Sequence, residues 1–325
     1  MTRRKLLQAS VGLMAGQIGG EYLEASPPQG RQFRPYTPST PPKGRIVDMH
    51  VHPWFQNGRP AAPKFSKRAW NSSRPDGDFQ MNASWKQFQY DMDAVDRAVI
   101  LHVARDLGTK GNDEMAAIAK RWPEKLVPFG SVNPTLPGAL EEFRRGVKEL
   151  GLKGFKLSPI YQKFDPMSAV AARIYNQAQE WGIPLIFHTA TAQAADVPLK
   201  WANPLLFDDV AYAFPRLKII MAHFGHPWQR ECTVMARKHQ NVYMELSANF
   251  YRPWELYQAL QFAMGWGQTG KIFLGTDWPV TTARETMAGL RGLNQFAKGG
   301  NPRIPDEVIE SIIHRDALGI LEIDG

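Results

Sequence analysis

Residues 46–54, Ile-Val-Asp-Met-His-Val-His-Pro-Trp, form the stretch from which the fold and the chemistry of this chain can be predicted. An apolar run leads into His50 and His52, two residues apart. Because alternate side chains of a β-strand share a face, both imidazoles point the same way at the strand end. Two neutral imidazoles so placed can bind a divalent metal ion. This stretch alone leaves an equal alternative, a hydrogen-bonded core histidine beside a histidine at the loop edge.

Short apolar runs rich in β-branched residues recur along the chain and alternate with longer helical patterns. Strict alternation favours a parallel sheet of the α/β class, and eight such units predict a single-domain (β/α)₈ TIM barrel. The alternative is an open doubly wound sheet, but no glycine-rich phosphate loop follows the first run. The eight runs are 46–49, 98–103, 126–132, 152–157, 184–188, 217–222, 242–246 and 272–275.

Helical periodicity fills the intervals between the runs. Residues 137–150 and 167–181 each place apolar side chains on one stripe, as an amphipathic helix does. A last helix is predicted over about 305–321. The interval between the first two runs, 53–97, is unusually long and contains a helical segment near 85–95. An insertion at the active-site end of a barrel is expected to cover a substrate pocket.

Composition limits the classes of partner. The 325 residues carry a formal charge of +8, but residues 1–45 hold seven Lys or Arg against two Glu and so contribute most of the excess. No basic run interleaved with aromatics follows, so a nucleic-acid partner is not expected. The single cysteine, Cys232, excludes an intrachain disulfide.

The N-terminus has the character of an export signal. Thr2-Arg3-Arg4-Lys5-Leu6-Leu7 precedes a weakly apolar stretch, too short and too mild for a transmembrane helix, so stable membrane insertion is not expected. Residues 1–25 resemble a twin-arginine signal, which implies a periplasmic protein. The alternative is a basic disordered tail on a cytoplasmic protein. Residues 26–44 are proline-rich and predict a linker, which leaves 45–325 for the barrel.

Chemistry-bearing side chains fall at the ends of several predicted strands, where the active sites of barrels lie. Most of the eight histidines of the chain take part, together with one aspartate. Chance clustering of this kind is improbable, so the metal-site interpretation is favoured. The residues are His50 and His52 after the first run, His188 after the fifth, His223 and His226 after the sixth, and Asp277 after the eighth.

This set of motifs resembles the amidohydrolase superfamily over about residues 45–323. Within it the chain is most similar to the amidohydrolase-related branch, which includes hydrolases and aminocarboxymuconate-semialdehyde decarboxylase-like enzymes. Segments 154–159, 222–228 and 251–254 are similar to those of uncharacterised bacterial members. The same ligands serve several reactions, so the resemblance is stronger evidence for fold and metal than for reaction.

The resemblance implies a ligand set and two catalytic residues. One divalent metal ion, zinc ahead of manganese, would be held by His50, His52, His188 and Asp277. Asp277 would also take a proton from a metal-bound water, and His223 would act as general acid/base and oxyanion stabiliser. The alternative for His223 is a fifth ligand or a structural hydrogen-bonding residue.

Lys156 is ambiguous, because some superfamily members carboxylate a lysine on the fourth strand to bridge two metals. It lies a little before the strand end, which favours one metal and a lysine that anchors a substrate anion or a buried carboxylate. An aromatic rim would suit a ring-bearing substrate, with an arginine pairing its carboxylate; packing of the tryptophans over the barrel mouth is equally open. The further substrate-binding candidates are Trp54, Trp228, Trp278, Arg252 and His226, followed by Arg105 and His102.

Three functions remain. The first is a metal-dependent hydrolase that acts on an ester, lactone or amide of a small carboxylated or ring-bearing compound. The second is a metal-dependent non-oxidative decarboxylase of an aromatic or dienoic acid. The third, a binding barrel without chemistry, ranks last because no ligand or acid/base position is missing. The resemblance also implies a homodimer.

Overall fold

A computed structural model describes residues 44–53, 84–192, 196–249 and 252–323. The predicted export signal, nearly all of the linker, Trp54 and most of the long insertion lie outside these residues. Within them, every helix is too short or too polar to cross a membrane.

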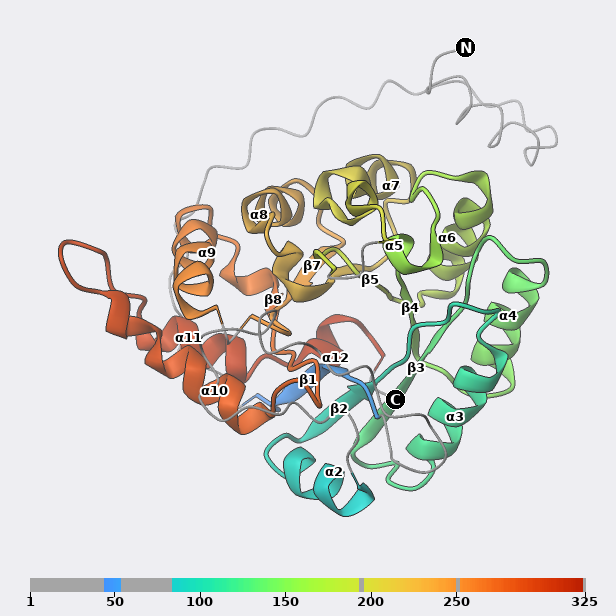
Figure 1. The fold of residues 1–325 in the computed structure, drawn as a ribbon, viewed down its shortest axis with the longest axis horizontal. Helices are drawn as coiled ribbons and strands as arrows, with labels where there is room; N and C mark the ends of the chain where they lie inside the picture. Colours follow the sequence, from blue (N-terminus) through green and yellow to red (C-terminus); the bar gives the residue numbers. More distant parts are fainter. Residues whose placement is uncertain (1–43, 54–83, 193–195, 250–251, 324–325) are drawn as a thin grey trace, which may run out of the picture. The chain divides into compact units, whose positions relative to one another are not determined.

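Eight parallel strands form one sheet in which each strand pairs with the next along the chain (Figure 1). The last strand returns to the first: Met49 N donates to Leu274 O at 2.9 Å, and Val51 pairs with Trp278. The sheet therefore closes into a barrel, and the predicted TIM barrel is confirmed. The strands are β1 Val47–Val51, β2 Arg97–Ile100, β3 Leu126–Ser131, β4 Gly154–Leu157, β5 Leu185–Phe187, β6 Ile219–Met221, β7 Val242–Glu245 and β8 Ile272–Phe273.

Helices follow the strands and lie around the outside of the barrel (Figure 1). Side chains cap the starts of several helices: Ser84 accepts a hydrogen bond from Gln87 N, and Thr282 forms a capping box with Glu285. The helices are α2 Trp85–Met92, α3 Thr109–Ala119, α4 Ala139–Lys148, α5 Pro159–Gln162, α6 Ala169–Trp181, α7 Phe207–Ala213, α8 Gln229–Lys238, α9 Pro253–Gly265, α10 Ala283–Arg291, α11 Asp306–Ile313 and α12 Ala317–Ile320.

The predicted helices 85–95, 137–150 and 167–181 correspond to α2, α4 and α6. The single last helix predicted over about 305–321 is wrong, because the chain forms α11 and α12 instead. Asp316 breaks the run: its side chain accepts a hydrogen bond from Gly319 N and caps the start of α12. Aspartate competes with the helix backbone in this way and so favours caps over helix interiors.

A bulge in β1 determines which way the histidines point. Val47 and Met49 belong to the apolar cluster inside the barrel, whereas Val51 belongs to the cluster between the sheet and the helices. The pairing register with β2 shifts between Asp48 and Val51. Because a one-residue shift exchanges the two faces of a strand, the side chains that alternate with Val51 face the barrel interior. The bulge thus turns His50 and His52 inward.

Candidate metal centre and its hydrogen-bond network

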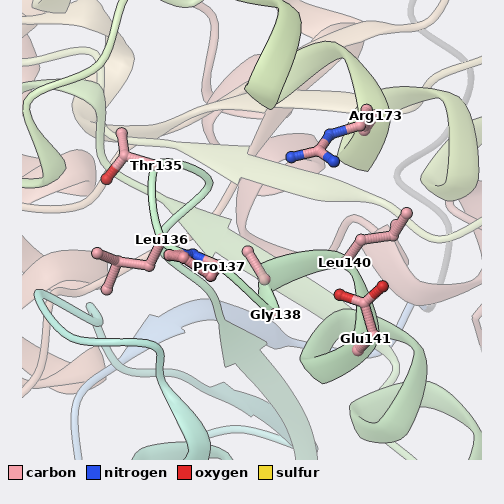
Figure 2. Close-up of a pocket in the computed structure, with 8 residues that line it drawn as sticks. Thr135, Leu136, Pro137, Gly138, Leu140, Glu141 and Arg173 are labelled. Atoms are coloured by element: carbon pink, nitrogen blue, oxygen red, sulfur yellow. The ribbon is translucent and has the colours of Figure 1, made fainter.

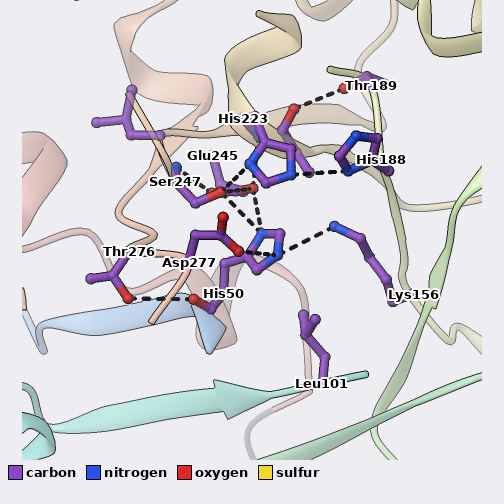
Figure 3. A network of polar contacts seen from close by, with 12 residues as sticks. His50, Leu101, Lys156, His188, Thr189, His223, Glu245, Ser247, Thr276 and Asp277 are labelled. Carbon is purple, nitrogen blue, oxygen red and sulfur yellow. Dashed lines mark hydrogen bonds and ion pairs between the residues drawn. The ribbon is translucent and has the colours of Figure 1, made fainter. Parts of the chain in front are cut away.

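Three ligand-type side chains meet at the mouth of the barrel, where β1 and β8 end; Figure 3 shows two of them, His50 and Asp277. His50 Nε2 lies 3.2 Å from His52 Nε2 and 3.5 Å from Asp277 Oδ1, and His52 Nε2 lies 3.3 Å from the same oxygen. Four ligands placed tetrahedrally about 2.1 Å from a zinc ion would be about 3.4 Å from one another. The three observed separations therefore match one face of a metal coordination shell.

The other ring nitrogens of the two histidines show which atoms carry lone pairs. His50 Nδ1 lies 2.8 Å from Glu245 Oε1, and His52 Nδ1 lies 3.0 Å from Leu101 O. A carboxylate and a carbonyl only accept, so Nδ1 of each ring carries a hydrogen and Nε2 is the nitrogen that can hold a lone pair. Both Nε2 lone pairs then face each other and Asp277, an arrangement that a cation between them stabilises. Metal-bound histidines typically donate their second N–H to such acceptors.

The backbone sets the position of Asp277. Its φ angle is +65°, in the left-handed region that aspartate tolerates better than most residues, and its N–H donates to His50 O at 2.8 Å. Burial raises the pKa of its carboxyl above the ordinary value, so the group is a better proton acceptor than an exposed aspartate. Unusual backbone geometry of this kind is concentrated at functional sites.

Asp48 joins the two strands that carry these ligands. Its carboxyl accepts from His50 N at 3.1 Å, from Thr276 N at 3.0 Å and from Thr276 Oγ1 at 2.6 Å. Burial raises its pKa to about 7. Sequence reasoning did not assign Asp48, although an aspartate inside the apolar run before His50 was a visible signal.

Glu245 and Ser247, at the end of β7, were also missed. Glu245 is fully buried, and its Oε1 accepts from His223 N at 2.9 Å, from Ser247 Oγ at 2.8 Å and from His50 Nδ1. Ser247 N donates to Oε2 at 2.6 Å. The signal was present in the sequence Val-Tyr-Met-Glu-Leu-Ser, where a glutamate ends an otherwise apolar strand. A buried carboxylate with this many donors is held in one position.

A second group, His50, His223 and Glu245, also has ligand atoms within 4.8 Å of one another. Ser247 Oγ lies among them, 3.1 Å from His50 Nδ1 and 2.8 Å from His223 Nδ1 (Figure 3). Its hydroxyl and the carboxylate already satisfy these nitrogens. We therefore place the candidate metal site at His50, His52 and Asp277 and regard the second group as a hydrogen-bond network.

His223 and His188 extend this network towards β5. His223 Nε2 lies 3.1 Å from His188 Nδ1, and both rings are buried. His223 has a φ angle of +58°. Burial lowers the pKa of both imidazoles, that of His188 to about 3 with a further contribution from Lys156, so both are neutral at pH 7. Both ring nitrogens of His223 have hydrogen-bond partners, which fits the alternative that His223 is a structural hydrogen-bonding residue. An acid/base role for His223 stays a prediction.

His188 is the one predicted ligand outside the group of His50, His52 and Asp277, whose ligand atoms all lie within 4.8 Å of one another. Its Nε2 is buried and has no hydrogen-bond partner in the part of the chain that the structure describes. Buried polar atoms without partners are rare and mark sites where an ion or water belongs. This orphaned nitrogen therefore fits a metal centre, and its ligation stays a prediction.

Lys156, on β4, is buried beside the candidate ligands. Its Nζ lies 3.4 Å from His50 Nε2, close enough for the amine to donate to that lone pair. Burial lowers its pKa to about 8, and the nearby Glu245 and Asp277 partly offset this effect. These neighbours fit a lysine that balances buried carboxylates. An anchoring role towards a substrate anion stays a prediction.

Trp278 is packed beside α2, and a role in a substrate rim stays a prediction. Its side chain is 1% exposed, its indole Nε1 donates to Asp91 Oδ2 at 2.9 Å, and its ring packs against Phe88 with centroids 4.9 Å apart. The packing alternative accounts for these contacts, because α2 covers the loop after β8. Trp228 is half-buried beside Ile160, and Trp54 lies outside the described residues.

Two of the remaining candidates follow β6 and β7. His226 Nδ1 contacts Glu255 at 3.1 Å, and burial, with Arg252, lowers its pKa to about 4. Arg252 also donates to Ala248 O at 3.0 Å. Substrate binding by these residues stays a prediction.

Two further candidates lie on the loop after β2. His102 lies 2.9 Å from Asn112 Oδ1, which fits a packed interior residue. Arg105 lies 5.6 Å above the ring of Tyr161, and that ring in turn lies 5.0 Å from His188. Arg105 is exposed and close to the site, so it is the better placed of the two to meet a substrate anion.

A cavity of about 450 Å³ opens elsewhere, between the loop before α4 and α6 (Figure 2). Its charged side chains are Glu141 and Arg173, and it contains none of the residues of the polar cluster. A cavity without convergent polar groups is a poor candidate for catalysis. We place the chemistry at the barrel mouth.

Several solved structures are similar to this chain. An uncharacterised TIM-barrel protein from Bordetella bronchiseptica has a TM-score of 0.64 at 21% identity, with 86% of this chain and 98% of that one covered. A dihydroxybenzoic acid decarboxylase from a Polaromonas species, with bound manganese and the inhibitor 2-nitroresorcinol, has a TM-score of 0.59 at 16% identity, with 86% and 97% covered. A probable 2-pyrone-4,6-dicarboxylic acid hydrolase from Acinetobacter baumannii, with bound citric acid, has a TM-score of 0.58 at 14% identity, with 86% and 99% covered.

At these identities the structures show a shared fold and leave the reaction open. The family model described as amidohydrolase matches residues 47–320, which spans β1 to α12 and includes every candidate ligand. The chain therefore belongs to the amidohydrolase family of enzymes, as its histidine and aspartate motifs predicted.

Proposed function

We propose that this protein is a metal-dependent hydrolase that cleaves an ester, lactone or amide of a small carboxylated or ring-bearing compound. The observation that supports it most is the triangle formed by His50 Nε2, His52 Nε2 and Asp277 Oδ1 with sides of 3.2, 3.3 and 3.5 Å. One carboxylate and two imidazoles suit zinc, with manganese as the alternative.

The residues present could bind and assist such an ion. A divalent metal here supplies a Lewis acid and lowers the pKa of bound water towards neutrality. Glu245 and Leu101 O keep the two imidazoles in the orientation and tautomer that a ligand needs. Asp277, whose side chain is 16% exposed, is the acid in the triangle that solvent can reach, and its raised pKa suits it to accept a proton from the attacking water.

Basic side chains near the triangle favour an anionic substrate. Lys156 Nζ is within 3.4 Å of His50 Nε2, and Arg105 lies over Tyr161 at the barrel mouth. Burial raises the pKa of the Tyr161 hydroxyl to about 12, so it remains a neutral hydrogen-bond donor. A carboxylate on the substrate would find these groups beside the metal site.

The second candidate is a metal-dependent decarboxylase of an aromatic or dienoic acid. The likeness to a dihydroxybenzoic acid decarboxylase with bound manganese favours it, as does the concentration of neutral, buried acid/base groups. A metal held by His50, His52 and Asp277 would supply a Lewis acid for such a substrate, and a protein group would protonate the carbon that loses carbon dioxide.

One experiment separates the two functions. Protein stripped of metal with a chelator and reconstituted with zinc or manganese is assayed on a panel of lactones, esters and amides, and on aromatic and dienoic carboxylates. The hydrolase proposal expects metal-dependent hydrolysis and no release of carbon dioxide. Carbon dioxide release without hydrolysis would establish the second candidate. Full activity in the stripped protein would exclude metal catalysis in both.

A further inference from the structure

Four buried side chains form a continuous chain of contacts from β7 to β5 (Figure 3). Glu245 Oε1 contacts Ser247 Oγ at 2.8 Å, Ser247 Oγ contacts His223 Nδ1 at 2.8 Å, and His223 Nε2 contacts His188 Nδ1 at 3.1 Å. Each middle member has one exchangeable hydrogen, and Ser247 Oγ also lies 3.1 Å from His50 Nδ1, which donates and so leaves the hydroxyl hydrogen for Glu245 or His223. The position of one hydrogen therefore determines the positions of the next two.

We propose that Glu245 and Ser247 are positioning residues that set the ring tautomers of His223 and His188, so that His188 carries its hydrogen on Nδ1 and keeps Nε2 as a lone pair. The proposal deepens the proposed function, because an unprotonated nitrogen is the form in which histidine binds a metal. It assigns roles to two residues that the ligand motifs do not include.

The direction of the hydrogen bonds follows from the carboxylate. Glu245 can only accept, so the Ser247 hydroxyl donates to it in a charge-assisted bond. Ser247 Oγ is then left to accept from His223, which must carry its hydrogen on Nδ1. His223 Nε2 becomes an acceptor, and His188 must donate to it from Nδ1.

If the hydrogen bonds along these contacts ran in the opposite direction, the arrangement would be less favourable at both ends. The Ser247 hydroxyl would turn from the carboxylate to a neutral imidazole, a weaker acceptor. His188 would then carry its hydrogen on Nε2, where it would be a buried donor without an acceptor in the described residues. Orphaned buried N–H groups are rarer than orphaned acceptors. The contact between His223 Nε2 and His188 Nδ1 requires one of these two nitrogens to accept, so the two nitrogens cannot both carry a hydrogen.

Histidine tautomers are measured directly from the ¹⁵N shifts and long-range ¹H–¹⁵N couplings of the imidazoles in the metal-free, ¹⁵N-labelled full chain. The expected result is Nδ1–H at both His223 and His188. Ser247→Ala removes the acceptor for His223 Nδ1–H, so both rings should change to Nε2–H. Ser247→Thr keeps the hydroxyl and should keep the original tautomers. Ser311→Ala is the matched control: it removes a buried hydroxyl that donates to Val308 O at 2.9 Å and accepts from Arg315 Nη2 at 3.5 Å, away from the four contact residues.

Nε2–H at His188 in the unmodified protein would overturn the proposal, as would unchanged tautomers in Ser247→Ala. The unmodified protein decides the question even where Ser247→Ala fails to fold. Metal affinity is the second readout: loss of an outer partner typically weakens binding about 10–100-fold, and Ser247→Ala should fall in that range. Absence of metal binding by the unmodified protein would instead reject the metal site, whatever the tautomers are.

Discussion

The two halves of the barrel mouth use the same residue types in opposite ways. On the side of β1 and β8, three acceptor atoms of His50, His52 and Asp277 converge within 3.5 Å of one another. On the side of β7 and β6, Glu245 and His223 surround the hydroxyl of Ser247, and each polar atom there meets a partner.

The difference shows how a metal site can be distinguished from a hydrogen-bond network in a cluster of histidines and carboxylates. Proximity alone does not separate the halves, since both bring ligand atoms within 4.8 Å. Donors and acceptors do separate them: a network alternates the two, whereas a metal site gathers lone pairs. Substitutions of the residues whose lone pairs converge beside β1 and β8 should therefore abolish metal binding. Substitutions in the hydrogen-bond network beside β7 and β6 should only weaken it.

The largest effect is expected from Asp277→Asn. The amide lacks the charge that a divalent ion requires, and its NH₂ group can take the position of the ligand oxygen. Metal affinity measured by competition with a chromophoric chelator should fall by more than the about 10–100-fold typical of an outer partner. Asp113→Asn, at an exposed ion pair with Arg145, is the control and should bind as the unmodified protein does. Equal affinity of Asp277→Asn would remove Asp277 from the ligand set.

Gly275→Ala should weaken metal binding by displacing residues of the hydrogen-bond network beside β7. A Cβ at Gly275 would collide with Glu245 Oε2 and lie 3.3 Å from Ser247 Cβ, so the carboxylate that holds His50 would have to move. We expect an affinity loss of about 10–100-fold together with a lower melting temperature. Gly265→Ala, where a Cβ meets nothing within 4 Å, is the matched substitution and should preserve affinity. Unchanged affinity in Gly275→Ala would show that Glu245 does not support the centre.

The fold could be predicted from the sequence because its signal is repeated eight times. Each strand run was found within a few residues, and the closure of β8 onto β1 follows from their number. The ligand candidates could be predicted because histidine is rare and stands at strand ends. Whether they bind a metal together is a question for the experiments above.

Glu245, Ser247 and Asp48 could not be assigned from the sequence, because their roles depend on partners about 200 residues away, such as His50 for Glu245 and Thr276 for Asp48. The bulge in β1 could not be predicted from the sequence either. Strand alternation correctly placed His50 and His52 on one face, but the bulge selects the face. Periodicity describes a strand by itself, whereas hydrogen-bond partners and register are set by its neighbours.

Trp278→Phe tests whether Trp278 binds substrate or only stabilises the fold beside the candidate metal site. The substitution removes the donor to Asp91 Oδ2, which is buried, and should lower the free energy of unfolding by about 2 kcal/mol. Metal affinity and KM should not change, since the ring packs against Phe88. Trp228→Phe provides the comparison at a half-buried tryptophan. A raised KM in Trp278→Phe, with stability retained, would instead establish the predicted substrate-binding role.

The last prediction concerns the pH dependence of the metal-free protein. Burial lowers the pKa of His188 to about 3, while the same residue in the unfolded chain has a pKa of about 6.5. Between these two pKa values the unfolded state binds a proton at His188 that the folded state does not bind. The free energy of unfolding therefore falls as the pH decreases through this range, and the contribution of His188 is complete above it. The slope contributed by one such group is about 1.4 kcal/mol per pH unit.

His188→Asn removes this group, so its unfolding free energy should depend less steeply on pH below 6.5, by up to that slope. Urea unfolding of the chelator-treated variant and of the unmodified protein, each referred to its own value at pH 7.5, measures the difference. An identical slope in both would mean that the folded state protonates His188 as readily as the unfolded chain does, so that burial does not lower the pKa of this imidazole. Below that pKa the ring would carry a hydrogen on both nitrogens, and the contact with His223 would not hold it in one tautomer.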